Sequence, residues 1–435
     1  MTSVWNMINK YMEKSTFLRH VATLTTGTAS GQIIIIAASP LLTRIYSPED
    51  FGLLGIYVSL LAILVRLSSL QYDKTITLPK DTLDASALTL LSFVILVIST
   101  LIVGIIIFFI GEKLSLLFDI LSFSQYLFLL PVSLLGIGTY EIMSKWAMRK
   151  EQYSSIAKTK VTQSFIMVSS QVMGGLLFVG PISLLVGDAL GRMTGSSRLF
   201  VNSVKQDLSL FKKVTLPHIM TLATRYKKFP LLSSISALTR QISTELPTLL
   251  LIFFYGPAVG GSYVLVQRIL SVPLNLIGTS IDNVMLAETS HLLHSNPNKI
   301  KKLVFKTMKN MFYIISPIMI VIALSAPSAF PFIFGEKWAD TGIYVSILSL
   351  MYFFQFISVP FSPILIVLER QGLQVIRELI RILLISGSLW YANLKDIDAM
   401  GAIILISVAG ALSFISYSVF SWFALHQFKL KLKLK

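Results

Sequence analysis

The segment from residue 42 to residue 55 reads Leu42-Thr-Arg-Ile-Tyr46-Ser-Pro48-Glu-Asp-Phe-Gly52-Leu-Leu-Gly55 and places a short charged turn between two long apolar runs. Its Tyr-x-Pro-x-x-x-Gly spacing returns between two further apolar runs, at Tyr255-Gly-Pro257-Ala-Val-Gly-Gly261. A helix-interrupting proline precedes each copy, Pro40 in the first and Pro247 in the second. This recurrence indicates that the second half of the chain repeats the first.

A second pair of similar segments occurs in the same order. Ile110-Gly-Glu-Lys113 is matched by Phe334-Gly-Glu-Lys337. Two ordered recurrences predict a duplicated unit of the kind that builds many membrane transporters.

The composition predicts a membrane protein. The 435 residues are 54% hydrophobic and 13% charged, with a mean hydropathy of +0.75. A helix of about 20 apolar residues crosses the roughly 30 Å hydrocarbon core of a bilayer, and the chain supplies such runs repeatedly. The net charge of +16 comes from clusters beside the apolar runs, which favours membrane topology over nucleic-acid binding. The absence of cysteine excludes disulfides and thiolate metal sites.

We expect an all-α polytopic membrane protein with twelve transmembrane helices in two six-helix halves around a central cavity. The predicted domains are an N-terminal half (1–201), a basic amphipathic linker on the cytoplasmic side (202–232), a C-terminal half (233–425) and a basic cytoplasmic tail (426–435). The predicted helices span residues 20–43, 52–72, 85–110, 124–146, 156–178, 182–201, 233–255, 262–286, 310–332, 341–367, 373–392 and 399–425.

Lysines and arginines predict the orientation. They gather in every second connection, and the alternate connections hold only Arg44, Lys113, Lys337 and Lys395. The positive-inside rule therefore predicts that both termini are cytoplasmic. The segment before the first helix lacks the features of a cleavable signal peptide.

Charges inside the hydrocarbon layer are the best pointers to function, because they are costly unless they face water or a partner. Arg66, Arg240 and Arg268 fall within predicted helices. Guanidinium groups bind phosphate in a bidentate manner, so these arginines suit a phosphorylated or acidic cargo.

Other intramembrane charges have two interpretations each. Asp188 and Arg192, four residues apart, either neutralise one another or face a transport path. Glu245 either couples transport to a proton or sodium gradient or forms a fixed pair with Arg240. Glu378 with Arg381, and Glu141 with Lys145, are interpreted as pairs at the membrane interface.

The helices predicted at 156–178 and 182–201 are rich in glycine, serine and glutamine. Either they pack tightly against one another or they form a cavity wall.

Enzymatic patterns are absent from the sequence. The chain has no phosphate-binding Gly-x-x-x-x-Gly-Lys-Ser/Thr loop, and its five histidines do not form a three-ligand metal site. We therefore predict neither catalytic residues nor a metal, and no cofactor. The energy for transport must then come from a gradient, a partner or consumption of the product.

Three segments resemble the polysaccharide-transporter family of the multidrug, oligosaccharidyl-lipid and polysaccharide exporter (MOP) superfamily. They are Pro40-Leu-Leu-Thr-Arg44-Ile-Tyr-Ser-Pro48-Glu49-Asp50-Phe51-Gly52, Leu78-Pro79-Lys80-Asp81 and Phe334-Gly335-Glu336-Lys337-Trp338-Ala339. We interpret the Pro-Glu-Asp-Phe-Gly turn as a structural cap, with substrate contact as the alternative.

The resemblance implies a flippase of the bacterial inner membrane. Such a protein moves polyprenyl-pyrophosphate-linked oligosaccharide repeat units, for O-antigen (a part of lipopolysaccharide), capsule or exopolysaccharide, from the cytoplasmic to the outer leaflet by alternating access. The resemblance implies that basic residues line the cavity, a role that falls to Arg66, Arg240 and Arg268. The expected partners are the lipid-linked oligosaccharide, the bilayer, and the polymerase and chain-length regulator of the pathway.

Three rival functions are weighed against a flippase of this kind. A multidrug or cation antiporter of the related extrusion family requires acidic cavity residues. The lipid-linked peptidoglycan precursor flippase often carries two further C-terminal helices. A polysaccharide polymerase or ligase carries a large outside loop with catalytic arginines or a histidine, and no such loop is predicted here.

Overall fold

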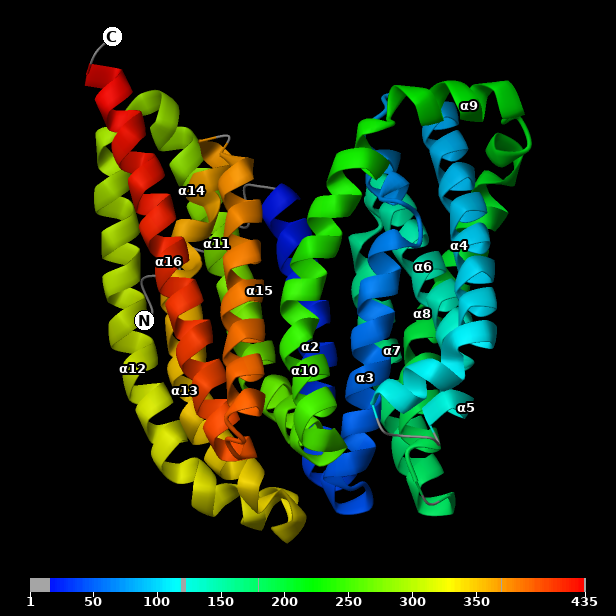
Figure 1. The fold of residues 1–435 in the computed structure, drawn as a ribbon. Helices are drawn as coiled ribbons and strands as arrows, with labels where there is room; N and C mark the ends of the chain where they lie inside the picture. Colours follow the sequence, from blue (N-terminus) through cyan, green and yellow to red (C-terminus); the bar gives the residue numbers. More distant parts are fainter. Residues whose placement is uncertain (1–15, 119–122, 179, 369, 434–435) are drawn as a thin grey trace. The chain divides into compact units, whose positions relative to one another are not determined.

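The computed structural model describes residues 16–118, 123–178, 180–368 and 370–433, and every regular element within them is helical (Figure 1). The first half of the chain forms α2 (Thr16–Ile45), α3 (Pro48–Leu67), η1 (Tyr72–Thr77), α4 (Thr82–Leu117), α5 (Ser124–Leu127), α6 (Leu129–Arg149), α7 (Tyr153–Leu177), α8 (Ile182–Phe211) and α9 (Leu216–Arg225). The second half forms η3 (Phe229–Ser233), α10 (Ser234–Val266), η4 (Gln267–Ser271), α11 (Val272–Ser295), α12 (Asn298–Phe334), η5 (Glu336–Trp338), α13 (Ala339–Ser358), η6 (Val359–Phe361), α14 (Ser362–Val367), α15 (Gln371–Leu394) and α16 (Ala399–Lys433).

The long helices carry apolar surface outward. In α4, Phe108 and Phe109 are 71% and 73% exposed, which is stable only in a nonaqueous surrounding. Within the described residues, eight helical stretches are long and apolar enough to cross a membrane. One of them, Phe229–Leu293, is broken at Gly256, whose φ is 84°. The protein is therefore a multi-pass membrane protein, and the number twelve and the cytoplasmic termini stay predictions.

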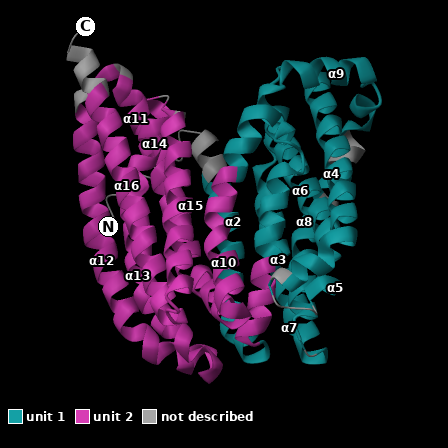
Figure 2. Cartoon of the chain, viewed as in Figure 1, with its two compact units in different colours: residues 1–46, 57–238 teal, residues 47–56, 239–435 magenta. Residues whose placement is uncertain are grey.

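The chain divides into two compact units, coloured separately in Figure 2. Unit 1 comprises residues 1–46 and 57–238, and unit 2 comprises residues 47–56 and 239–435. Helix α3 is therefore shared, because its first turns cluster with unit 2 and its remainder with unit 1.

In unit 1, helix α7 packs closely on both α2 and α8. A Cβ atom added at Gly27 of α2 would lie 2.5 Å from the Cβ of Ala157, and one at Gly191 of α8 would lie 2.4 Å from the Cβ of Met167. Gln163 donates a hydrogen bond across the α7–α8 contact to the carbonyl oxygen of Arg192, at 3.0 Å. Small and polar residues thus hold these two helices together, which agrees with the packing interpretation of this polar region.

Helix α8 extends to Phe211, beyond the predicted end at residue 201. The extension is stabilised by Asp207, which accepts a hydrogen bond of 3.0 Å from the Trp146 indole and pairs with the Lys150 ammonium at 2.9 Å. Trp146 is 1% exposed within the core of unit 1, where Phe211 also packs. The polar residues of this last part of α8 therefore have tertiary partners that the local hydropathy did not reveal.

The turn at Ser47 has the chemistry of a helix start. Pro48 occupies the first position of α3, where a missing N–H costs nothing. The Ser47 hydroxyl accepts from the Asp50 N–H at 3.3 Å, and the Asp50 carboxylate accepts from the Ser47 N–H at 2.9 Å. This reciprocal capping agrees with the structural interpretation of the Pro-Glu-Asp-Phe-Gly turn.

In unit 2 the two copies of the Tyr-x-Pro-x-x-x-Gly spacing cross each other. A Cβ atom added at Gly52 would lie 2.1 Å from the carbonyl oxygen of Pro257, and one at Gly261 would lie 1.8 Å from the carbonyl oxygen of Pro48. The glycine of each copy thus receives the proline backbone of the other. Only a residue without a side chain permits this approach, which explains why both the proline and the glycine recur.

The tyrosines of the two copies also play matching parts. The Tyr46 hydroxyl donates to the carbonyl oxygen of Gln171 in α7 at 2.7 Å, within unit 1. The Tyr255 hydroxyl donates to the carbonyl oxygen of Ile397, just after α15, at 3.2 Å within unit 2. Each tyrosine therefore fixes its turn to main chain of its own unit.

Two details of the predicted repeat were wrong. Pro40 and Pro247 lie inside α2 and α10 rather than interrupting them, because transmembrane helices tolerate proline where nearby groups satisfy the freed backbone. The second recurrence is not a structural one. Gly335 ends α12 with φ 99°, whereas Gly111 lies inside α4, which continues past residue 110 to Leu117 because Glu, Lys and Leu favour helix.

Replacing Gly261 by alanine should destabilise the protein, because the new methyl group would overlap the Pro48 backbone. Overpacking of this kind costs about 1–3 kcal/mol, so the apparent Tm of the detergent-solubilised chain should fall by several degrees. Gly387→Ala in α15 is the matched control, since nothing lies within 4 Å of a Cβ atom there. Equal thermal shifts for the two variants would contradict the crossing.

Candidate functional site

Arg66 lies in the last turn of α3 and is half-buried. The charge of Arg66 acts on the carboxylate of Glu141 in α6, which is also half-buried, and Lys145, Lys160 and Asp73 act on the same carboxylate. Arg66 is therefore one member of a mixed-charge cluster in unit 1. Glu141 and Lys145, predicted to pair at the membrane interface, are thus members of a larger cluster, because α3 and α7 bring in charges that lie far away in sequence.

Arg268 lies in unit 2 within η4, a single π-helical turn between α10 and α11. Its guanidinium carbon is 5.3 Å from the centre of the Phe51 ring. The Phe51 ring packs edge-on against Trp338 with centroids 5.0 Å apart, and both side chains are fully buried. Two of the motifs singled out in the sequence thus meet beside Arg268, and π-helical turns are frequent at functional sites.

Arg240, near the start of α10, is exposed. It is an electrostatic neighbour of Asp282 in α11, whose carboxylate is also in hydrogen-bonding contact with Ser362. Glu245 is half-buried, and one of its carboxylate oxygens accepts a hydrogen bond of 2.8 Å from Gln241.

Asp188 and Arg192 form an ion pair on one face of α8, with 2.7 Å between Oδ2 and Nε. Asp188 is 4% exposed. Its charge acts on Tyr57 of α3, whose hydroxyl is hydrogen-bonded to Ser133 of α6. The pair therefore lies inside unit 1, among α3, α6 and α8.

Helix α15 carries functional candidates that the sequence analysis placed at the membrane interface. Glu378 is 4% exposed and forms an ion pair with the adjacent Arg377. The Arg377 guanidinium lies over the Tyr417 ring of α16, 4.2 Å from its centre, and the Arg381 guanidinium lies 5.4 Å from the centre of the Phe414 ring. Glu378 thus pairs with Arg377 rather than with the predicted Arg381, and both arginines contact aromatic rings within unit 2.

Polar side chains from α11, α14, α15 and α16 form a continuous network, which we call the α15 polar cluster. Its members are Asp282, Ser362, Arg377, Glu378, Arg381 and Tyr417. Ser362 joins two of its parts, because it is in hydrogen-bonding contact with both Asp282 and Tyr417. Arg381 extends the cluster toward Tyr263 and Tyr352.

The α15 polar cluster has hydrogen-bonding capacity left over. Among the described residues, Arg381 Nε, Glu378 Oε2 and Asp282 Oδ1 are buried atoms without a hydrogen-bond partner. Buried polar atoms are costly when their hydrogen bonds are left unmade. The cluster is therefore suited to receive water or a polar group of a ligand.

The chemistry that these side chains can perform is binding rather than bond-making. Guanidinium groups on aromatic faces hold a positive charge in place for an anionic ligand. In the part of the chain that the structure describes, no three His, Cys, Asp or Glu side chains are grouped to hold a metal ion.

The comparison with protein families matches residues 41–342 to the family described as "Polysaccharide biosynthesis protein". The chain belongs to this family. The match contains both crossing turns and the Phe334–Trp338 turn, and it ends before α15. The α15 polar cluster is therefore only partly covered by the family match. No curated protein matches the chain.

Solved structures show that this member of the polysaccharide biosynthesis family has the fold of MOP superfamily transporters. An inward-facing multidrug resistance MATE family transporter of that superfamily is 15% identical, with a TM-score of 0.74, covering 92% of this chain and 95% of the other. A MOP superfamily transporter from Pyrococcus furiosus is 15% identical, with a TM-score of 0.63, covering 95% and 96%. The family is described by polysaccharide biosynthesis, and the fold is one that MOP superfamily transporters have.

The Glu378→Gln variant should be less stable than the wild type, because it leaves the Arg377 guanidinium beside a neutral group. Breaking a buried pair on one side costs about 3–5 kcal/mol, whereas replacing both partners by apolar residues is often neutral. We therefore expect a lower Tm for Glu378→Gln and recovery in Arg377→Met/Glu378→Met. The control is Glu336→Gln, an exposed carboxylate. No recovery in the double variant would contradict the paired arrangement.

Proposed function

We propose that the protein moves polyprenyl-pyrophosphate-linked oligosaccharide units from the cytoplasmic to the outer leaflet of a bacterial inner membrane by alternating access. The observation that carries this proposal is the placement of Arg268 and Arg381. Both guanidinium groups are held on aromatic rings within unit 2, at 5.3 Å from Phe51 and 5.4 Å from Phe414.

The proposed cargo matches this placement in charge and in geometry. A pyrophosphate presents several negatively charged oxygens, and planar guanidinium groups bind such oxygens in pairs. A polyprenyl chain is apolar and can remain in the bilayer while the charged part crosses. The same side chains would be a poor surface for a cationic drug.

The comparisons support this proposal at a coarser level. The family is described by polysaccharide biosynthesis, and the fold is that of MOP superfamily transporters. The P. furiosus transporter is described as having a binding pocket of reverse polarity, which suggests a different function for that protein. A pocket lined by the arginines of this chain would suit an anionic cargo.

The proposal includes a site, an energy source and partners. Arg66 and Arg240 would add positive charge along the transport path, and Glu245 would respond to a proton or sodium gradient. The product would be O-antigen, capsule or another exopolysaccharide. The polymerase and chain-length regulator of the same pathway would act on units that reach the outer leaflet.

The proposal is tested with purified protein in proteoliposomes that contain a lipid-linked pyrophosphoryl sugar with a fluorescent reporter on the sugar. A membrane-impermeant reductant destroys only the reporters in the outer leaflet. We expect wild-type vesicles to lose the inner-leaflet reporters as well. Arg268→Ala and Arg381→Ala should slow this loss by about tenfold to a hundredfold, the effect of removing a charged hydrogen bond.

Two further variants make this test more specific, one that replaces Arg381 by lysine and one that removes a surface lysine. Arg381→Lys keeps the charge but loses the bidentate geometry, so its rate should lie between those of the wild type and Arg381→Ala. Lys395→Ala removes an exposed cation beyond α15 and should leave the rate unchanged. Wild-type vesicles that lose no more reporter than protein-free vesicles would refute the proposed cargo.

A second candidate is a multidrug or cation antiporter, which the carboxylates Asp282 and Glu378 of unit 2 favour. It predicts that an inward proton or sodium gradient drives efflux of a cationic dye. Asp282→Asn should then abolish dye transport while Arg268→Ala preserves it. The two candidate functions therefore make opposite predictions for Arg268→Ala.

A further inference from the structure

Helix α12 begins with an unusual combination of charge and length. Its first part carries Lys299, Lys301, Lys302, Lys306 and Lys309, and the whole helix from Asn298 to Phe334 has no acidic residue. At 1.5 Å per residue, its 37 residues measure about 55 Å, well beyond the roughly 30 Å hydrocarbon core. The uncharged part from residue 310 to residue 334 is long enough to fill that core, which would place the lysines at the depth of the lipid headgroups.

The lysines share one face of the helix. Lys302, Lys306 and Lys309 follow the helical spacing of four and three residues, which aligns side chains on one stripe. All three are exposed, and no carboxylate of the described residues lies within ion-pair distance of their ammonium groups. The stripe is therefore an unneutralised row of positive charge.

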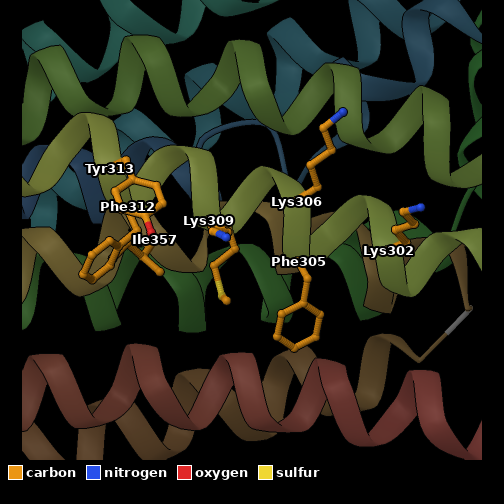
Figure 3. A pocket seen from close by; sticks show the side chains of 8 residues that line it. Lys302, Phe305, Lys306, Lys309, Phe312, Tyr313 and Ile357 are labelled. Atoms are coloured by element: carbon orange, nitrogen blue, oxygen red, sulfur yellow. The ribbon is translucent and has the colours of Figure 1, made fainter.

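A cavity of about 530 Å³ lies along this stripe (Figure 3). Besides the three lysines, it is lined by Phe305 and Phe312 of α12 and by Ile357 of α13. Figure 3 shows the Phe305 ring pointing toward α16 and the Lys306 ammonium group pointing away from it. The wall of the cavity is thus apolar, and the three lysines place positive charge beside it.

A second cavity of about 320 Å³ continues the apolar wall. It shares Phe305, Met308 and Ile357 with the first and extends along α16 from Trp422 to Phe414. The stretch of α16 from Phe414 to Trp422 is about 12 Å long. Lys301 lies 4.3 Å from the Trp422 ring centre, at the headgroup end. The two cavities together form one groove, which we call the α12–α16 groove.

We propose that the α12–α16 groove binds an anionic diacyl phospholipid of the surrounding bilayer. Its phosphate would lie between Lys302 and Lys306, and an acyl chain would follow Phe305 and Met308 toward Phe414. The charge of the lysine stripe selects an anionic headgroup, and the apolar continuation requires a long chain. This site shares no residue with the α15 polar cluster, although Phe414, which lines the second cavity, also lies 5.4 Å from the Arg381 guanidinium.

The test measures binding of phosphatidylglycerol to the full chain in neutral detergent by native mass spectrometry. Each juxtamembrane lysine contributes roughly a fivefold gain in affinity for anionic lipid, so Lys302→Gln/Lys306→Gln should bind about 30-fold more weakly than the wild type. Lys113→Gln/Lys395→Gln removes the same charge from exposed positions that do not line the groove. We expect this control to stay within about threefold of the wild type.

Further probes separate this lipid from other ligands with the same chemistry. Phosphatidylcholine with the same acyl chains tests whether binding requires an anionic headgroup. Inorganic phosphate and dihexanoyl phosphatidylglycerol test whether binding requires a long acyl chain. We expect all three to bind much more weakly than long-chain phosphatidylglycerol. Met308→Trp, which fills the groove and keeps every lysine, should weaken binding of the long-chain lipid only.

Three results would overturn the proposal. One is an equal loss of phosphatidylglycerol affinity in the two double-lysine variants. Another is binding of phosphatidylcholine as tight as that of phosphatidylglycerol. The third is binding of the short-chain lipid or of phosphate as tight as that of the long-chain lipid. The lysines are exposed, so the size-exclusion profiles of the double-lysine variants should match that of the wild type, and Met308→Trp provides a second measurement if one double variant does not fold.

Discussion

The mutual contact between two prolines and two glycines is the constraint on which unit 2 depends. Pro48 and Gly52 from early in the chain meet Pro257 and Gly261 from much later, at distances that exclude any side chain on either glycine. This crossing brings Phe51 against Trp338 and beside Arg268. A purely structural contact thereby positions one of the charged groups proposed to bind the cargo.

The charged side chains inside the two units differ in how completely they are paired. In unit 1, Arg192 is neutralised by Asp188, and Arg66 lies in a cluster that includes Glu141. In unit 2, the α15 polar cluster combines an ion pair with buried atoms that lack partners among the described residues. Buried polar atoms without partners are costly until water or a ligand satisfies them, so we place the proposed cargo site in unit 2.

The sequence predicted the class of the protein and the recurrence of the Tyr-x-Pro-x-x-x-Gly turn, because hydropathy and unusual residues are local signals. It could not separate Gly111 from Gly335, since the same Gly-Glu-Lys letters continue a helix in one place and follow a helix end in the other. It also placed Glu378 and Arg381 at the membrane interface. Their burial depends on Tyr417, Phe414 and Ser362, which are distant in sequence, so no local pattern reveals it. The roles assigned to Arg66, Arg240 and Arg268 stay predictions.

The sharing of α3 between the units has a consequence for biosynthesis. Residues 47–56 leave the ribosome long before Pro257 and Gly261, which complete their packing. At about 5–20 residues per second, the delay is roughly ten to forty seconds. During this time the backbone around Gly52 has no native partner, so the first half must wait in the membrane in an unfinished state. Translation speed and insertion factors therefore bear on how much of this protein matures, independently of the stability of the finished fold.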